Sequence, residues 1–198
     1  MADTFGRFVS NVIEFVFSGV LFLSTLAVLF RIFFPQSFVI VWNQLATGVS
    51  SSSSDTLLFV VGTAFAYAAG SFADYLSRIT FEWRLDQVKK MRQQKFSNPI
   101  SYGNMRFAIM ARHPDLYLEV ESQLKRMRIE RVLALCLALL LLAATTVLLQ
   151  DPSWFRFFVV IALAASLSLT IFQVEQRFQR YCRAIERGYI EVEATKEG

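Results

Sequence analysis

The sequence contains few of the residues on which enzyme active sites depend. It has one histidine, His113, and two cysteines, Cys136 and Cys182, which lie far apart in the chain. These residues cannot supply a typical zinc ligand set, and no nucleophile has a base at a suitable spacing. The sequence also has no phosphate-binding loop, nucleophile elbow or dinucleotide fingerprint. We therefore expect a protein that is not an enzyme and that holds neither a metal ion nor a cofactor.

Lysine and arginine are missing from two parts of the chain. Neither occurs from residue 32 to residue 77 or from residue 150 to residue 153, although the chain has 20 in total. Four apolar runs border these parts; they cover residues 12–35, 57–79, 132–149 and 154–174. Each run has about 18 or more mostly apolar residues, enough for a helix to cross a bilayer core of about 30 Å. The sequence therefore predicts four membrane spans.

The basic residues that are present predict the topology. Residues 79–131 hold eleven of them, the part after residue 174 holds five, and Arg7 precedes the first run. Segments rich in Lys and Arg stay in the cytoplasm. Only one topology satisfies every segment: both termini and residues 79–131 inside, and two short connections outside. With no Asn-x-Ser/Thr acceptor in the chain, we expect a multi-pass protein of the bacterial inner (plasma) membrane, with the lipid bilayer as its first partner.

The predicted fold is all-α, an integral membrane four-helix bundle in which spans two, three and four extend into a cytoplasmic helical stalk. No Gly or Pro interrupts residues 79–96, and apolar residues recur there at helical spacing. The chain is expected to have four parts. Residues 1–79 contain spans one and two with an external loop at 36–56, and residues 80–131 form a cytoplasmic helical segment. Residues 132–174 contain spans three and four, and residues 175–198 form a cytoplasmic helix and tail.

Two connections have recognisable local sequences. Residues 36–46 are mostly apolar but too short to span, which predicts an external helix or a re-entrant piece. Residues 47–55 are rich in serine and are expected to form a flexible loop. His113 precedes Pro114 and Asp115, which is typical of a helix start, so its interpretation is capping rather than catalysis.

Span two carries a face of small residues. Such a face lets two helix backbones approach closely in lipid, where van der Waals packing replaces the hydrophobic effect. The contact could lie within one subunit or between the subunits of a homo-oligomer, and both alternatives stay open. The helix-packing face consists of Gly62, Ala66, Ala69, Gly70 and Ala73.

Three ionisable residues lie in the first two runs near their cytoplasmic ends: Glu14, Asp74 and Arg78. Asp74 and Arg78 are four residues apart, so they can pair on one face of a helix. Intramembrane charge often marks an ion path. Long side chains near the interface can also reach the headgroups. The sequence therefore allows either an interfacial structural cluster or a gate.

The cytoplasmic segments are strongly basic, which accounts for much of the net charge of +4. Topology and contact with anionic headgroups explain this charge most simply. A cytosolic protein or an anionic ligand is the alternative, and nucleic acid is not expected because no recognised motif holds the nearby aromatic residues. The predicted surface consists of Lys89, Lys90, Arg92, Lys95, Arg106, Arg112, Lys125, Arg126, Arg128 and Arg131.

Two functional classes fit this pattern. The first is an oligomeric membrane protein whose basic cytoplasmic helices sense or dock a ligand or partner. Its architecture is similar to that of small membrane subunits of bacterial anti-phage systems, which implies a sensor or effector role in antiviral defence. The second is a constitutive or gated ion channel. A small-solute transporter is a third alternative, but the internal repeats and broken helices of that class are not found.

Overall fold

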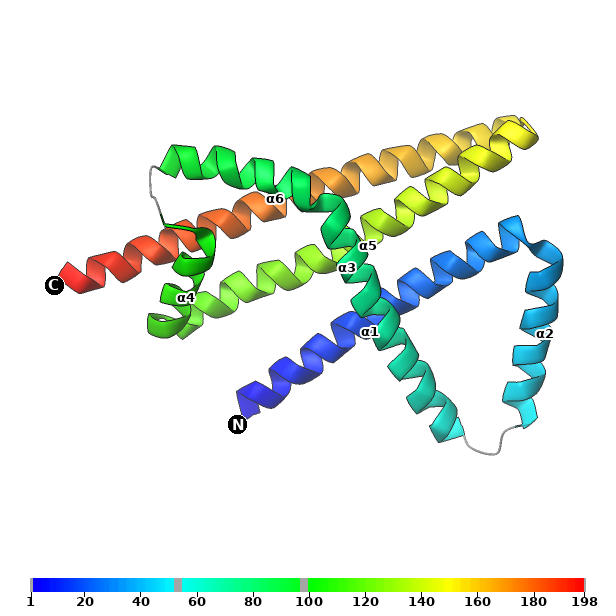
Figure 1. Cartoon of the computed structure of the whole chain (residues 1–198), viewed down its shortest axis with the longest axis horizontal. Coiled ribbons are helices and arrows are strands. Elements are labelled where there is room, and N and C mark those ends of the chain that lie inside the picture. The colour runs from blue at the N-terminus through cyan, green and yellow to red at the C-terminus, as the bar shows by residue number, and fades with distance from the viewer. Residues whose placement is uncertain (1, 52–54, 97–99, 198) are drawn as a thin grey trace. The chain divides into compact units, whose positions relative to one another are not determined.

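The structure is a computed structural model that describes residues 2–51, 55–96 and 100–197. Every regular element in these residues is an α-helix (Figure 1). The six helices are α1 (Ala2–Phe33), α2 (Pro35–Ser51), α3 (Asp55–Phe96), α4 (Tyr102–Arg112), α5 (Pro114–Gln150) and α6 (Trp154–Glu197). The predicted all-α class is therefore confirmed.

Three stretches of helix in the described residues are long and apolar enough to cross a membrane. They are Val9–Phe33 in α1, Asp115–Gln150 in α5 and Trp154–Glu193 in α6. This composition is consistent with a membrane protein. The span predicted at residues 57–79, and with it a bundle of four spans, stays a prediction.

Local sequence explains where the helices begin and end. Pro35 opens α2 at a position where its missing N–H is not needed. The side chain of Ser101 caps α4, and the backbone N–H of His113 donates to the carbonyl oxygen of Ile109 at its other end. Pro114 then opens α5 with Asp115 in the first turn. His113 is thus the C-cap of α4 and directly precedes the helix start that the sequence predicts at Pro114.

The serine-rich connection differs from its prediction. Residues 47–51 were expected to be a flexible loop, but they form the last turns of α2, and residue 55 already belongs to α3. Residues 52–54 lie outside the described residues. The Thr47 hydroxyl donates to the carbonyl oxygen of Asn43 at 2.9 Å. Serine is less favourable than alanine in a helix by under about 1 kcal/mol, so Ser50 and Ser51 can belong to the end of α2.

The chain divides into two compact units. The apolar unit comprises residues 1–77 and 132–168, and the charged unit comprises residues 78–131 and 169–198. In the apolar unit, Phe22 of α1, Ala73 of α3, and Val132 and Cys136 of α5 form a buried cluster. The residues at the heart of this cluster are mostly small, so their helices approach closely.

The core of the charged unit is built from larger side chains. Met105 and Ile109 of α4 meet Val120 of α5 and Ile185 of α6, and all four are at most 2% exposed. Phe178, Cys182, Tyr189 and Val192 continue the buried row along α6, at the three- and four-residue spacing of one helix face. The row predicted on α3 is buried at Phe81, Leu85 and Val88, whereas Met91 is exposed.

Candidate functional site

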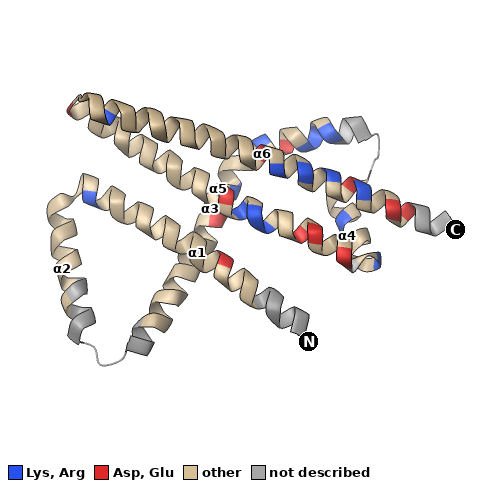
Figure 2. Cartoon of the chain, turned by 180° about the vertical axis from the view of Figure 1, so that it is seen from behind, with Lys and Arg blue, Asp and Glu red and all other residues tan. Residues whose placement is uncertain are grey.

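Charged side chains gather in one of the two units. The charged unit holds 17 of the 20 Lys and Arg residues and 11 of the 16 Asp and Glu residues. Figure 2 shows this concentration on α6 and α5 near α4. Because clustered charges attract soluble ligands and partners over a distance, the charged unit is the candidate site.

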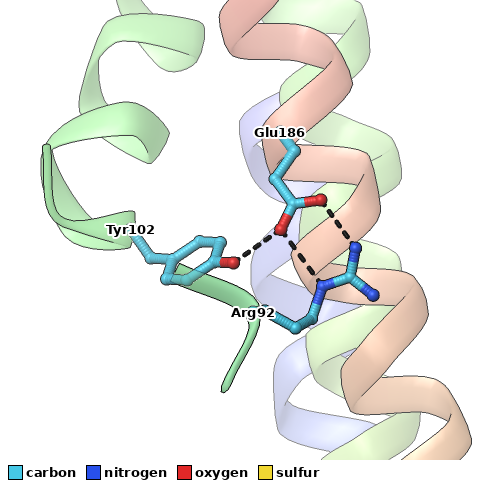
Figure 3. Close-up of polar contacts among 3 residues, drawn as sticks. All are labelled: Arg92, Tyr102 and Glu186. Atoms are coloured by element: carbon cyan, nitrogen blue, oxygen red, sulfur yellow. Dashed lines mark hydrogen bonds and ion pairs between the residues drawn. The ribbon is translucent and has the colours of Figure 1, made fainter. Parts of the chain in front are cut away.

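Three helices of the charged unit meet at one carboxylate (Figure 3). Glu186 of α6 accepts from Arg92 of α3, with Nη2 at 2.7 Å from Oε2 and Nε at 3.1 Å from Oε1. The Tyr102 hydroxyl of α4 donates to Oε1 of the same carboxylate at 2.6 Å. The bidentate geometry fixes both the distance and the orientation of α3 relative to α6 in this unit.

Both donors keep their protons. The hydrogen bond to Glu186 raises the pKa of Arg92 above its ordinary value. Burial, and then the hydrogen bond to Glu186, raises the pKa of Tyr102 well above 10, so the hydroxyl remains a donor. The Glu186 side chain is only 11% exposed. The three groups therefore form a satisfied structural contact, and none of them is left to react.

Further polar contacts join the helices of the same unit. Arg84 of α3 pairs with Glu175 of α6, and Arg177 of α6 pairs with Glu130 of α5. The Arg106 guanidinium donates to the Tyr117 hydroxyl at 3.0 Å and lies 5.4 Å from the centre of its ring. Each helix of the unit is thus tied to a neighbour by an ion pair or a charge-assisted hydrogen bond.

The structure divides the predicted basic surface into different environments. Arg92 and Arg106 make the contacts just described, and Arg131 is buried. Lys89 lies against Asp86 and the Phe178 ring. Lys125 lies 3.8 Å from Glu121. Three members are exposed: Lys90, Arg112 and Arg126. Arg128 is half-buried, and the side chain of Lys95 lies outside the described residues. The ten residues therefore do not form one uniform surface.

A second set of arginines lines a groove that the sequence analysis did not single out. This groove lies between α5 and α6 in the charged unit and has a volume of about 370 Å³. Arg180, Arg183 and Arg187 line it from α6, and all three are exposed. Its other lining residues are Leu116, Glu119 and Gln123 of α5 and Ala184, Gly188 and Glu191 of α6.

The spacing of these arginines was the signal that could have revealed the groove. Residues three and four apart lie on one helix face, so positions 180, 183 and 187 form a row. The basic surface predicted from the sequence includes only residues 89–131, whereas the arginines after residue 174 entered the topology alone. What the sequence could not supply is the register of α5 against α6, which brings Glu119 and Gln123 to the opposite wall.

The small-residue face has a clear position in the apolar unit. A Cβ atom added to Gly70 would overlap the carbonyl oxygen of Phe15 on α1, and one added to Gly19 would overlap the carbonyl oxygen of Ala66. Ala66 and Ala73 are buried, and Ala69 is half-buried. A Cβ atom at Gly62 would meet nothing within 4 Å. The face therefore packs against α1 at Ala66 and Gly70 and is open at Gly62.

The predicted charge cluster is divided between the two units. Glu14 is buried on α1, and Asp74 is half-buried on α3; both belong to the apolar unit. Arg78 is exposed and belongs to the charged unit. The Asp74 carbonyl oxygen accepts from the Ser77 hydroxyl at 2.8 Å, so the helix itself satisfies that serine.

Neither a search for metal-ligand clusters nor comparison with known proteins assigns a function to these residues. The described residues contain no group of three or more metal-ligating side chains. The chain matches no protein-family model, and comparisons with curated proteins and with solved structures find no relative.

Proposed function

We propose that the chain is a non-enzymatic, oligomeric protein of the bacterial inner membrane whose cytoplasmic charged unit senses or docks a cytosolic ligand or partner. The observation that carries this proposal is that α3, α5 and α6 each contribute residues to both units. A molecule that binds the charged unit and prefers one arrangement of its helices would bias the same helices farther along the chain.

The proposal includes span two, at residues 57–79 of α3, in addition to the spans in α1, α5 and α6. Its residues 59–79 expose large apolar side chains, among them Phe59, Phe65 and Phe72, while Ala66 and Gly70 contact α1. This is the arrangement of a helix that meets lipid on one side and another helix on the other. An even number of spans then places both termini on the same side, in agreement with the distribution of Lys and Arg.

Cysteine labelling in intact cells tests this topology. Both native cysteines, Cys136 and Cys182, are buried and give little background. A membrane-impermeant maleimide should label Gln150→Cys from outside and should label Asn104→Cys only after lysis; both positions are exposed. Labelling of Asn104→Cys in intact cells would overturn the proposal, because it would place the charged unit outside.

The defence role is the most specific part of the proposal and rests on architecture alone. Cells that carry the gene should plate some phages less efficiently than cells that lack it. Reversing the charge at two exposed positions, Lys90→Glu and Arg126→Glu, should remove this protection without lowering the amount of protein in the membrane. Full protection by this double variant, or no protection by the wild type against a broad phage panel, would count against the defence role.

A channel is the second candidate because α1 buries polar side chains within a predicted span. Glu14, Ser18 and Thr25 are all at most 7% exposed. Buried polar residues in a span often mark an ion path. The Thr25 hydroxyl donates to the Leu21 carbonyl oxygen at 3.0 Å, which gives that residue a structural role. Ion flux into liposomes that is lost in Glu14→Gln would favour the channel over the docking protein.

A further inference from the structure

The arginines of the α5–α6 groove differ from the other arginines of the charged unit. Arg92, Arg84 and Arg177 each form an ion pair with a carboxylate. Among the residues that the structure describes, Arg180, Arg183 and Arg187 form no ion pair within 4 Å like those of Arg84, Arg92 and Arg177, although the charge of Arg183 acts on Glu186 and helps to lower the pKa of that carboxyl group. The groove therefore concentrates cationic groups whose hydrogen-bonding capacity is still available.

The row of arginines suits an extended anion. From residue 180 to residue 187 the helix rises about 10 Å, at 1.5 Å per residue. The planar guanidinium group binds phosphate with two parallel hydrogen bonds, which a lysine cannot reproduce. Three such groups along one wall match a ligand with two or more phosphate groups better than a single phosphate.

The remaining walls narrow the ligand class. Glu119 and Glu191 would repel a molecule that is anionic along its whole length, but they can accept hydrogen bonds from hydroxyl or amino groups. The lining also includes Leu116, Ala184 and Gly188, which form an apolar surface without bulky projecting groups. The ring of a base or sugar can lie on this surface. A volume of about 370 Å³ is at the lower end of the range of small-molecule sites.

A lipid headgroup carries the same phosphate chemistry, but the position of the row favours a soluble molecule. If span four ends near residue 174, Arg180 lies about 9 Å and Arg187 about 20 Å farther along the helix. The headgroup region on one side of a bilayer is only about 5–8 Å thick. A headgroup could therefore reach Arg180, whereas Arg183 and Arg187 are placed for a ligand from the cytosol.

We propose that the groove between α5 and α6 binds a small organic molecule with two or more phosphate groups and with hydroxyl or amino groups, as in a nucleoside diphosphate. This inference rests on the proposed function, since it names the ligand class that the charged unit would sense. Arg183 and Arg187 bind the phosphates, Arg180 extends the row towards the membrane, and Glu119 accepts from the uncharged end.

The test is calorimetry on the full-length protein in phosphatidylcholine nanodiscs, with ADP, pyrophosphate and inorganic phosphate as probes. ADP should bind with a Kd below about 1 mM, more tightly than pyrophosphate and much more tightly than phosphate. Arg183→Gln and Arg187→Gln should each weaken ADP binding about tenfold. Arg187→Lys should weaken it several-fold, because the charge remains but the two parallel hydrogen bonds do not.

Arg84→Gln is the matched control, since it removes one arginine of the same unit outside the groove. The Arg84 side chain is 49% exposed, so loss of its ion pair should lower the stability by at most about 1 kcal/mol and should leave ADP binding unchanged. An equal loss of affinity in Arg84→Gln would show that only net charge attracts ADP and would overturn the proposal. Absence of ADP binding by the wild type would also overturn it.

The lipid arm uses the same protein in nanodiscs with about one third phosphatidylglycerol. Protection of α6 from hydrogen exchange that depends on this lipid and on Arg180, with no effect of ADP, would assign the row to headgroups and overturn the soluble ligand. In either failure, cytoplasmic labelling at Asn104→Cys would leave the proposed function standing. External labelling there would defeat both proposals at once.

Discussion

The apolar unit and the charged unit hold their helices together by opposite means. In the apolar unit, Gly19 and Gly70 bring the backbones of α1 and α3 into direct contact, with no side chain between them. In the charged unit, Met105 and Ile109 separate the helices, and Arg92, Tyr102 and Glu186 join them by hydrogen bonds. The apolar segments of the chain thus use direct backbone contacts, and the charged segments use large buried side chains and hydrogen bonds.

The difference follows from the solvent that each unit is proposed to meet. In lipid, burying apolar side chains between helices gains little, because lipid tails are just as apolar, so close backbone packing must hold the helices together. In water, large buried side chains contribute about 25 cal/mol for each Å² of apolar surface removed from solvent. The same helix, α3, uses the first kind of contact at Gly70 and the second kind at Leu85.

The largest effect is expected from Gly70→Leu. The Cβ atom alone would overlap the Phe15 carbonyl oxygen, and a backbone atom cannot move without moving α1. We expect a loss of more than about 3 kcal/mol, beyond the usual cost of overpacking, and with it little folded protein in the membrane. Thermal unfolding in detergent, followed by circular dichroism, measures this loss.

Gly62→Leu is the matched control, because it makes the same change eight residues earlier on the same helix, where a Cβ atom meets nothing within 4 Å. Its melting temperature should stay close to that of the wild type. If native mass spectrometry shows a smaller assembly for this variant, Gly62 lies at a subunit interface. Equal destabilisation by both leucines would contradict the contact between α1 and α3.

A smaller loss is expected in the charged unit from Glu186→Gln. The amide keeps the shape of the carboxylate but removes its charge, so Arg92 is left partly buried without an ionic partner. Breaking a buried pair costs about 3–5 kcal/mol, and because Arg92 is partly exposed we expect about 2–3 kcal/mol. Chemical denaturation in detergent, together with hydrogen exchange of α4, measures the loss.

Tyr102→Phe provides the graded comparison for that experiment. It removes one hydrogen bond to Glu186 and leaves the ion pair with Arg92 intact. Its cost should be about 1.5 kcal/mol, the lower value for a hydrogen bond to a charged group, because the carboxylate keeps its ionic partner, and its effect should be confined to α4. A larger loss for Tyr102→Phe than for Glu186→Gln would show that the tyrosine, rather than the ion pair, organises the three helices.

The smallest effect is expected from Gly188→Ala, which sharpens the comparison between the two units. A Cβ atom at Gly188 would lie 3.0 Å from the Cδ1 atom of Ile109, the end of a flexible side chain. The cost of moving that atom is offset by the gain of about 1 kcal/mol when alanine replaces glycine in a helix. We expect a net change below about 1 kcal/mol in thermal unfolding. Gly70→Ala, by contrast, should be strongly destabilising.

Sequence periodicity predicted much of this fold for physical reasons that can be named. A helical segment that no Gly or Pro interrupts continues unless packing stops it, so α3 extends through residues 79–96 to Phe96; α6 passes its apolar run although it contains Gly188. The row Phe178, Cys182 and Ile185 is buried because residues three and four apart share a face. Composition failed at residues 47–51, since serine weakens a helix only slightly.

The candidate site was harder to predict because it depends on contacts between distant segments. The partner of Gly70 is Gly19, which the sequence shows only as one glycine in an apolar run. Arg92 and Arg180 look alike in the sequence, but one is paired with Glu186 and the other lines a groove. Only the register between helices separates a structural arginine from one that can meet a ligand.

The crossing of α1 and α3 also limits how these helices can rotate. Two aromatic pairs flank the crossing: Phe15 with Tyr67 at 5.3 Å between ring centres, and Phe22 with Phe72 at 6.3 Å. A contact between two backbones fixes the separation of the helices but has no side chains that interlock. The two pairs lie in opposite wedges of the crossing, so rotation about that point would separate the rings of both pairs or crowd the rings of both. The ring pairs therefore set the angle between the two helices, and the glycines set the distance.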